Sequence, residues 1–535
     1  MRPFSLADAG VTARGYNPHC LLLACLALIA GGLHAASLAW PLPSLELLSI
    51  TALQRGQPLW WLQLLSMAAL VSLLMRSHSA KEAAWLGWLF ALAWLSLTFG
   101  WLYTSMYVYG GLNATLAVLA VLALAAVLGL YYAAACWFFW PLALAQKPQA
   151  AIIFASLWLL AELARGQWLT GFGWGSAAYA HVDGPLQNLV VWLGAYGAGW
   201  VAAALAALLA MAFRPTRWLG RAVAVVGGVL VLLLAPMLLP WPAGAMQGTL
   251  KVTLLQGNIA QEEKFEPATG VLHALRWYGE QLRVAQGDLV ITPETALAVL
   301  PEQLPEGYWS AVQQRFSQGR QAALVGLPLG SYARGYTNSV TGFKPDQSAP
   351  WRYDKHHLVP FGEFIPPLFR WFTNLMRIPL GDFNRGALPQ PTFDWQDQRL
   401  AVSICYENLF SEEMATQFVD TARAPTILVN ISNLGWFGEH LAMDQHLQIA
   451  RMRALEFGRP FLLATNTGQT AIVNHRGVVT HQLVAHTAAV LTGEVQGRSG
   501  VTPYAYWAAR WGQWPLWLFA LLVVGLAALH RQRSR

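Results

Sequence analysis

Charged residues are almost missing from the first half of this chain, and no other feature limits its fold as strongly. Between residues 20 and 240, apolar runs follow one another, several of them near the 20 residues needed to cross the hydrocarbon core of a bilayer. Residues 248–510 carry an ordinary mixture, with 21 Lys and Arg against 22 Asp and Glu. The sequence therefore predicts a helical membrane part followed by an ordinary water-exposed domain.

We predict eight membrane-spanning helices from the apolar runs, seven before the water-exposed domain and one after it. This places a membrane domain at residues 1–245, the water-exposed domain at 246–510, and a last span with a basic tail at 511–535. The expected spans cover residues 20–40, 58–75, 84–106, 113–141, 150–164, 187–213, 222–240 and 513–530.

Basic residues gather in one set of the loops between these spans. That set and the two tails hold 11 Lys and Arg, whereas the opposite short loops hold only Arg55 and Arg165. Basic loops stay on the cytoplasmic side, so the domain at 246–510 is expected to face outward. Because this domain has a net charge of −1, the overall charge of +7 needs no nucleic acid as a partner.

The domain at 246–510 alternates short β-rich runs with helical runs. Helical patterns occur at residues 268–284, 305–318 and 440–457, and β-rich runs lie between them from residue 252 to residue 474. Such alternation is typical of layered α/β domains. Cys405 is the only cysteine in this part of the chain, so an internal disulfide is excluded.

Three of the predicted strands run into a reactive side chain. Glu294 follows one strand, Lys355 a second and Cys405 a third, and sites at strand ends are common in α/β sheets. A thiolate is a strong nucleophile, and Glu294 can accept the thiol proton. We expect Lys355 to lower the pKa of Cys405 and to stabilise an oxyanion.

The segments around these residues resemble the three motifs of the nitrilase superfamily. They read Thr-Pro-Glu-Thr-Ala at 292–296, Tyr-Asp-Lys-His-His-Leu-Val-Pro-Phe-Gly-Glu at 353–363 and Ile-Cys-Tyr-Glu at 404–407. Within the superfamily, the eight-span frame resembles the membrane-bound branch, the apolipoprotein N-acyltransferases. Further segments resemble this branch at residues 161–172, 255–259, 433–437 and 453–460.

The resemblance implies an α-β-β-α sandwich joined to the multi-span membrane domain, and an acyl transfer in two steps. By this resemblance, Cys405 takes an acyl chain from a phospholipid, phosphatidylethanolamine, as a thioester. The chain then passes to the amino group of the S-diacylglyceryl cysteine that begins an apolipoprotein. Glu294 corresponds to the general base and Lys355 to the oxyanion-stabilising lysine. We expect a monomer in the bacterial inner membrane, with the catalytic domain on the periplasmic side and no cofactor or metal.

Further site residues follow from the same resemblance. Glu363 corresponds to a second essential carboxylate, and Tyr406 and Glu407 flank the nucleophile. An apolar segment at 361–376 is expected at the bilayer surface beside the site. The candidates for substrate binding are aromatic, and Phe265 stands where well-known relatives have Trp: Phe265, Trp436, Phe364, Phe369 and Trp371.

Other interpretations stay open from the sequence. A membrane-tethered amidase that hydrolyses C–N bonds would use the same three residues, and a transporter or scaffold would use none of them. His356 and His357 are adjacent but lack the spaced partners of a zinc site. Glu162 and Arg165, three residues apart near the end of the fifth span, fit either a structural ion pair or a role facing the substrate.

Overall fold

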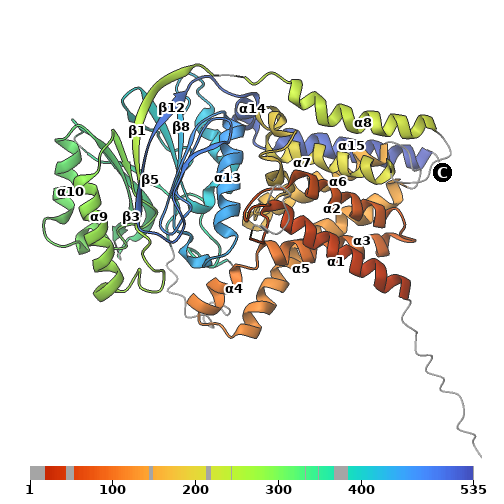
Figure 1. Cartoon of the computed structure of the whole chain (residues 1–535), viewed down its shortest axis with the longest axis horizontal. Coiled ribbons are helices and arrows are strands. Elements are labelled where there is room, and N and C mark those ends of the chain that lie inside the picture. The colour runs from red at the N-terminus through yellow and green to blue at the C-terminus, as the bar shows by residue number, and fades with distance from the viewer. Residues whose placement is uncertain are drawn as a thin grey trace, which may run out of the picture.

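A bundle of helices lies against a two-sheet sandwich in the computed structural model of this chain (Figure 1). At positions 18, 19 and 219–226 the structure describes the backbone alone. The structure describes residues 18–43, 53–143, 149–212, 219–242, 244–331, 333–347, 349–366 and 383–533.

The bundle is built from long apolar helices that precede the sandwich and one that follows it. Their bounds are α1 (Pro18–Leu38), α2 (Trp60–Leu74), α3 (Ala80–Thr98), α5 (Ala114–Ala143), α6 (Gln149–Gln167), α7 (Gln187–Ala212), α8 (Leu219–Leu238) and α15 (Trp514–Arg533). Among the described residues, five of these helices are long and apolar enough to cross a membrane, namely α1, α5, α6, α7 and α15.

The predicted span at 84–106 is broken. Helix α3 ends at Thr98, and the next helical segment, Leu102–Tyr109, is bent from it by 62°. The break falls at Gly100, where glycine disfavours helix, and the flanking rings of Phe99 and Trp101 turn into the protein core. The bent pair makes a sixth span if its two parts are counted together. The predicted spans at 58–75 and 222–240 form α2 and α8, whose described apolar parts are shorter.

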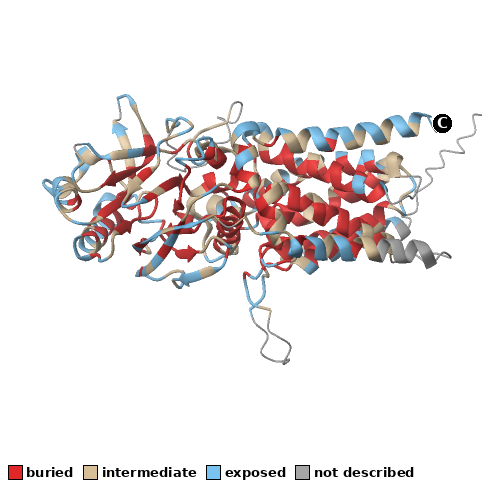
Figure 2. Ribbon diagram, turned by 90° about the horizontal axis from the view of Figure 1, so that it is seen from above, coloured by how far each residue is buried: buried red, intermediate tan, exposed pale blue. Residues whose placement is uncertain are grey.

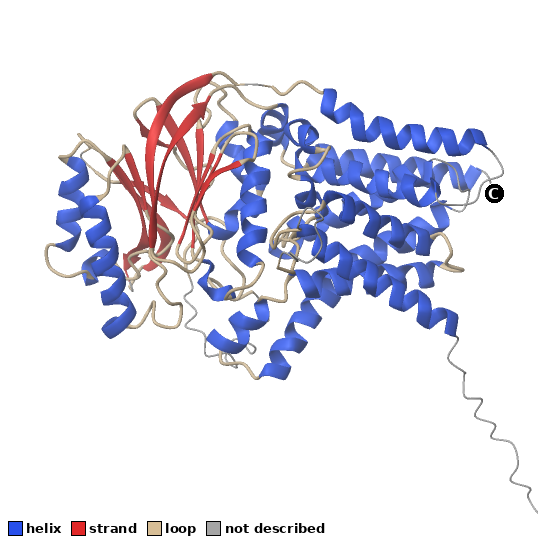
Figure 3. Ribbon diagram, viewed as in Figure 1, coloured by secondary structure: helices blue, strands red, loops and turns tan. Residues whose placement is uncertain are grey.

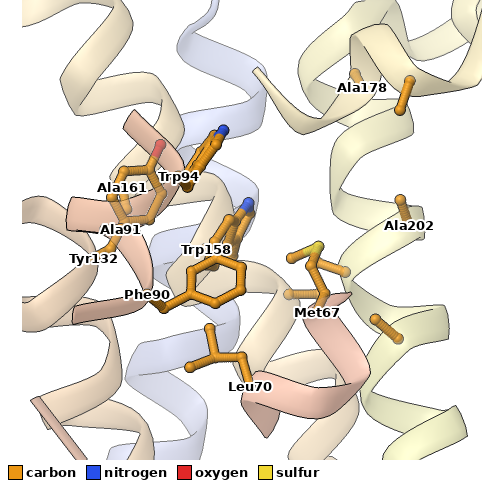
Figure 4. Close-up of a cluster of buried hydrophobic side chains, with 14 of the residues drawn as sticks. Met67, Leu70, Phe90, Ala91, Trp94, Tyr132, Trp158, Ala161, Ala178 and Ala202 are labelled. Carbon is orange, nitrogen blue, oxygen red and sulfur yellow. The ribbon is translucent and has the colours of Figure 1, made fainter. Parts of the chain in front are cut away.

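Large aromatic rings and small residues fill the centre of the bundle (Figure 4). The rings of Trp94 and Trp158 stack at 5.7 Å between centroids, and Tyr132 meets Trp94 edge-on at 5.0 Å. Alanines such as Ala91 and Ala161 pack in the same cluster. Small side chains let membrane helices approach closely, so the bundle has a packed core of its own.

The water-exposed domain contains two six-stranded sheets in the described part of the chain. In order across the first sheet, the strands are β12 (Ala489–Arg498), β1 (Met246–Gln256), β2 (Leu289–Ile291), β3 (Ala322–Ser331), β4 (Gly335–Phe343) and β5 (Trp351–Asp354). Across the second they are β11 (Val479–Gln482), β10 (Ala471–Val473), β9 (Phe461–Thr465), β8 (Ile427–Ser432), β7 (Gln398–Ile404) and β6 (Phe393–Trp395).

The two sheets stack with helices on both outer faces (Figure 3). Leu254 and Ile291 of the first sheet and Val402 and Val429 of the second belong to one buried cluster between them. Helices α9 (Leu272–Val284) and α10 (Tyr308–Ser317) cover the first sheet, and α13 (Ala442–Phe457) covers the second. This is the α-β-β-α layering of the nitrilase-like fold.

Helix α13 lies between the second sheet and the membrane bundle. Its residues Ile449 and Met452 share a buried cluster with the bundle, and buried positions continue from one part into the other (Figure 2). The carboxylate of Glu456 accepts a hydrogen bond from the backbone N–H of Ala195 at 2.7 Å. The sandwich is therefore packed onto the bundle through α13.

Candidate active site

The structure brings the three strand-end residues predicted from the sequence into one cluster. Glu294 follows β2 by a short turn, and Lys355 directly follows β5 in the same sheet. Cys405 directly follows β7 in the facing sheet. The ammonium of Lys355 lies 3.1 Å from Oε1 of Glu294, with both side chains buried, and the charges of both act on the Cys405 thiol.

The backbone at Cys405 turns sharply out of the strand. Its φ is 50°, in the left-handed region that residues other than glycine rarely adopt. The side-chain amide of Asn430, on the neighbouring strand β8, donates to the carbonyl oxygen of Cys405 at 3.2 Å. Strained backbone of this kind persists where the surroundings hold it, and it is common at functional sites.

Glu294 is held as a carboxylate and Lys355 as an ammonium. Glu294 accepts hydrogen bonds from the amide of Asn338 at 2.7 Å and from the backbone N–H of Asn433 at 2.8 Å. Burial alone would raise the pKa of Glu294, but the charge of Lys355 and the bond from Asn338 bring that pKa below its usual value. Burial would likewise lower the pKa of Lys355, but Glu294 and Glu363 raise it above its usual value.

Glu363 completes a cluster in which Lys355 and Asn338 each bridge two carboxylates. Its Oε1 accepts from Lys355 at 2.9 Å and from Asn338 at 2.7 Å, and its Oε2 accepts from the backbone N–H of Val359 at 2.8 Å. The sequence did not point to Asn338. Its amide stands among Thr337, Ser339 and Thr341 in strand β4, so no local pattern distinguishes it.

The charge of Lys355 lowers the pKa of the Cys405 thiol, as expected from the sequence, but other effects outweigh it. Burial raises the pKa of the thiol, Glu294 raises it further, and Lys355 offsets this only in part. At neutral pH the sulfur therefore keeps its proton. The neighbouring carboxylate of Glu294 is placed to accept this proton as the sulfur attacks.

A second lysine, Lys264, lies beneath Glu294. Its side chain is buried, and its Nζ donates to the backbone carbonyl oxygen of Glu294 at 3.1 Å. Burial lowers the pKa of Lys264 to about 7, despite the opposing charges of Glu294 and Cys405. The sequence did not indicate that Lys264 is buried, because it stands among charged residues, between Glu263 and Glu266.

Replacing Lys264 by methionine is expected to change how stability depends on pH. The pKa of Lys264 is about 7 in the folded protein and 10.5 when exposed, so the unfolded chain binds more protons between these values. Lys264 therefore contributes a rise in stability between pH 7 and pH 10.5, and Lys264→Met should remove this contribution. Thermal unfolding in detergent across this range measures it. The exposed Lys251 supplies the control: equal slopes for Lys264→Met and Lys251→Met would contradict the prediction.

Glu407 connects the turn at Cys405 to the segment after β5 through hydrogen bonds. Its carboxylate accepts four hydrogen bonds, from the backbone N–H groups of Ile404, His356 and His357 and from the hydroxyl of Tyr353. Burial raises the pKa of Glu407 to about 7, against the lowering effect of these N–H donors. Glu407 thus connects the strand ends that carry Lys355 and Cys405.

The Glu407→Ala variant is expected to lose about 3 to 5 kcal/mol of stability, because four buried donors lose their acceptor. Denaturant or thermal unfolding of the purified protein measures the loss. The matched control is Glu494→Ala, which removes an exposed carboxylate near Lys251 and should change stability by less than about 0.5 kcal/mol. A similar small change in both variants would rule out this role for Glu407.

Tyr406, His356 and His357 all form hydrogen bonds with other groups of the protein. The hydroxyl of Tyr406 donates to the carbonyl oxygen of Gly171 at 2.9 Å. His357 uses one ring nitrogen towards Glu413 and the other towards the carbonyl oxygen of Thr170. His356 Nδ1 lies 2.7 Å from the carbonyl oxygen of Gly386. Among the residues that the structure describes, no three His, Cys, Asp or Glu side chains are grouped to hold a metal ion.

Two of the predicted substrate-binding aromatics, Phe265 and Trp436, belong to one cluster of rings, called here the aromatic wall. The rings of Phe265 and Trp436 stack at 6.3 Å, and Tyr109 of the bent membrane segment meets Trp436 at 5.7 Å. Phe364 lies apart from this wall, under the guanidinium of Arg385 at 4.9 Å. The predicted candidates Phe369 and Trp371, and the apolar segment beyond residue 366, fall outside the described residues.

Comparison with known proteins gives matches over most of the chain. Residues 47–208 match the family described as Apolipoprotein N-acyltransferase N-terminal domain, and residues 251–504 match the family described as Carbon-nitrogen hydrolase. The chain is 52% identical to the apolipoprotein N-acyltransferase of Verminephrobacter eiseniae, over 91% of this chain and 92% of that protein.

Two further relatives carry the same name. The apolipoprotein N-acyltransferase of Ralstonia nicotianae is 43% identical, over 89% of this chain and 90% of that protein. That of Bordetella bronchiseptica is 40% identical, over 94% of this chain and 96% of that protein. The likeness therefore extends across both the helical bundle and the sandwich.

Proposed function

Because this chain belongs to the apolipoprotein N-acyltransferase family, and is therefore an acyltransferase, we propose that its acyl group is carried on the sulfur of Cys405. The observation that carries this proposal is the placement of a carboxylate and an ammonium, Glu294 and Lys355, against a single thiol at a strained strand end. Such a set supplies a base, an oxyanion stabiliser and a nucleophile.

In the first step, the Glu294 carboxylate accepts the thiol proton while the sulfur attacks the ester carbonyl of a phospholipid. The negative charge that develops on the carbonyl oxygen is stabilised by Lys355. The ester C–O bond then breaks, and Glu294 returns the proton to the leaving oxygen. The products are a lysophospholipid and a thioester on Cys405. We propose phosphatidylethanolamine as the donor.

In the second step, the neutral α-amino group of an S-diacylglyceryl cysteine attacks the thioester. Glu294 accepts a proton from the attacking amine, and Lys355 again stabilises the oxyanion. The C–S bond breaks, the sulfur recovers a proton, and an amide forms on the apolipoprotein. Glu363, Tyr406 and Glu407 are proposed to support these steps by holding Lys355 and the Cys405 turn in place.

The proposed setting is the bacterial inner membrane, with residues 1–245 and 511–535 in the bilayer and 246–510 on the periplasmic side. This counts α2 and α8 as short spans, which local bilayer thinning can accommodate. The orientation is supported by the basic residues at one end of the bundle, such as Lys81 and Arg531. In this setting the aromatic wall of Phe265 and Trp436 would face the lipid substrate, and the protein would act as a monomer.

A membrane-tethered amidase would differ in what discharges the thioester. Protein loaded with phospholipid is mixed with a diacylglyceryl lipopeptide, and both the N-acylated peptide and free fatty acid are measured. We expect most of the acyl chain on the lipopeptide. A lipopeptide with an acetylated amino group is the control and should accept none. Release of free fatty acid at the same rate with either peptide would favour the amidase.

A further inference from the structure

A buried ion pair in helix α6 lies under a loop that reaches the active site. Glu162 and Arg165 stand three residues apart, with 3.6 Å between Oε1 and Nη2 and both side chains buried. The hydroxyl of Tyr132 joins them, because it accepts from Nε of Arg165 at 2.8 Å and donates to Oε1 of Glu162 at 2.9 Å. Of the two possibilities left open by the sequence, the pair inside the protein is the one observed.

The same pair holds the loop of residues 168–176, named here the membrane loop. Nη1 of Arg165 donates to the carbonyl oxygens of Phe172 at 2.6 Å and Trp174 at 2.7 Å. At the far end of the loop, the hydroxyl of Ser176 donates to Oε2 of Glu162. One ion pair therefore fixes the membrane loop at three points.

The membrane loop has an unfavourable backbone that needs such support. Leu169, Thr170 and Gly171 all have positive φ, at 54°, 79° and 76°. A side chain at Gly171 would place its Cβ 2.1 Å from the carbonyl oxygen of Gly166. Left-handed residues in succession persist only where neighbouring groups determine them, and the hydrogen bonds from Arg165 supply this.

Two further carbonyl groups of the membrane loop accept hydrogen bonds from residues beside the catalytic cluster. Thr170 accepts from Nε2 of His357 at 2.9 Å, and Gly171 accepts from the hydroxyl of Tyr406 at 2.9 Å. The ring of Phe172 also stacks on that of Tyr406, 6.2 Å between centroids. His357 follows Lys355 by two residues, and Tyr406 follows Cys405 directly.

We propose that Glu162 and Arg165 are positioning residues for the acyl-transfer site. By fixing the membrane loop, they set the positions of Tyr406 and His357, and thereby the alignment of Cys405 with Lys355 and Glu294. This inference rests on the proposed function only in that Cys405 is taken as the nucleophile. It gives the membrane domain a part in the chemistry beyond anchoring the catalytic domain.

The geometry requires arginine at position 165. Its guanidinium donates at the same time to Tyr132, Phe172 and Trp174, which the single ammonium of lysine cannot reproduce because it is a compact point charge. Arg165→Lys is therefore expected to behave like Arg165→Gln. Glu162→Gln should be milder, because the amide oxygen can still accept one of the bonds from Tyr132 and Ser176.

A double-mutant cycle tests the proposal. The rate at which a thiol reagent alkylates Cys405 is measured by mass spectrometry of its peptide, across a range of pH, for Arg165→Gln, Tyr406→Phe and the double variant. Arg165→Gln should slow the reaction about tenfold, the effect of a one-unit rise in the pKa of Cys405, because the sulfur then lies farther from the ammonium of Lys355, whose charge lowers that pKa. The double variant should be no slower than the slower single variant. Losses that multiply would overturn the proposal, because they indicate independent sites.

A matched control breaks a different contact between bundle and sandwich. Asp183 accepts from Arg451 of α13 at 2.9 Å, away from the membrane loop, so Asp183→Asn should leave the alkylation rate within about twofold. If Arg165→Gln lowers the yield of folded protein, Glu162→Gln takes its place in the cycle with the same two outcomes. An Arg165→Gln protein with wild-type alkylation and only a lower melting temperature would also overturn the proposal.

The assay needs no lipid, so it separates this inference from the proposed function. Coupling between Arg165 and Tyr406 in the alkylation rate, without acyl transfer from phospholipid, would contradict the proposed function alone. Acyl transfer through Cys405 without that coupling would contradict the positioning role alone.

Discussion

The Cys405→Ser variant is expected to lose acyl transfer by about 10⁴-fold or more, the scale seen when a nucleophile is removed from a set that acts as a unit. A serine hydroxyl is a far weaker acid than a thiol, so the carboxylate of Glu294 removes its proton much less readily. N-acylated lipopeptide, measured by mass spectrometry with phospholipid as donor, reports the loss.

Cys25→Ser is the matched control for this variant. Cys25 lies on the exposed side of α1, outside the cluster at Cys405, and its replacement should leave transfer unchanged. The melting temperature of Cys405→Ser should stay close to that of the wild type, since the two side chains are similar in volume. Transfer by Cys405→Ser within tenfold of the wild type would show that the sulfur is dispensable.

The Glu294→Gln variant is expected to lose about 10²- to 10⁴-fold in transfer, the range for removing a general base. Glutamine keeps the shape of the side chain and an oxygen that accepts from Asn338, but its NH₂ group cannot accept from the backbone N–H of Asn433, so the loss combines the missing charge with one hydrogen bond. The loss should appear in the rate of thioester formation at saturating phospholipid.

The same variant should change the thiol in the opposite direction. Burial raises the pKa of Cys405 first, and the negative charge of Glu294 raises it further. With that charge removed, the pKa falls, and alkylation of Cys405 at alkaline pH becomes faster while acyl transfer becomes slower. Asp394→Asn, at an exposed carboxylate, should change neither rate. If Glu294→Gln slowed both reactions equally, Glu294 would be a structural residue and not the base.

Local sequence was enough to single out the three reactive residues, because each lies in a short motif at or just after the end of a strand. It was not enough for Asn338, whose partners Glu294 and Glu363 come from other segments. Nor could it predict the contact between Tyr406 and Gly171, since these residues are 235 positions apart. Contacts across such separations depend on how the sandwich packs on the bundle, which no local pattern records.

The strands were predicted unevenly for a related reason. Strands β2 and β8 are buried throughout and rich in Ile, Leu and Val, as is typical of parallel strands. Strand β12 lies at the edge of its sheet, pairs with β1 and buries only a few of its residues, so its sequence lacks the apolar pattern of a buried strand. The net pKa shift at Cys405 could not be predicted from the sequence either, because it depends first on burial and then on the opposing charges of Glu294 and Lys355.

The most direct test of the central claim is to incubate the purified protein with a phospholipid of defined acyl chain and then to measure the mass of the Cys405 peptide. The account predicts a gain equal to one acyl chain on this peptide, reversed by hydroxylamine, and absent from Cys405→Ser and strongly reduced in Glu294→Gln. An unmodified Cys405 peptide during active turnover, or an acyl chain found on another residue, would contradict it.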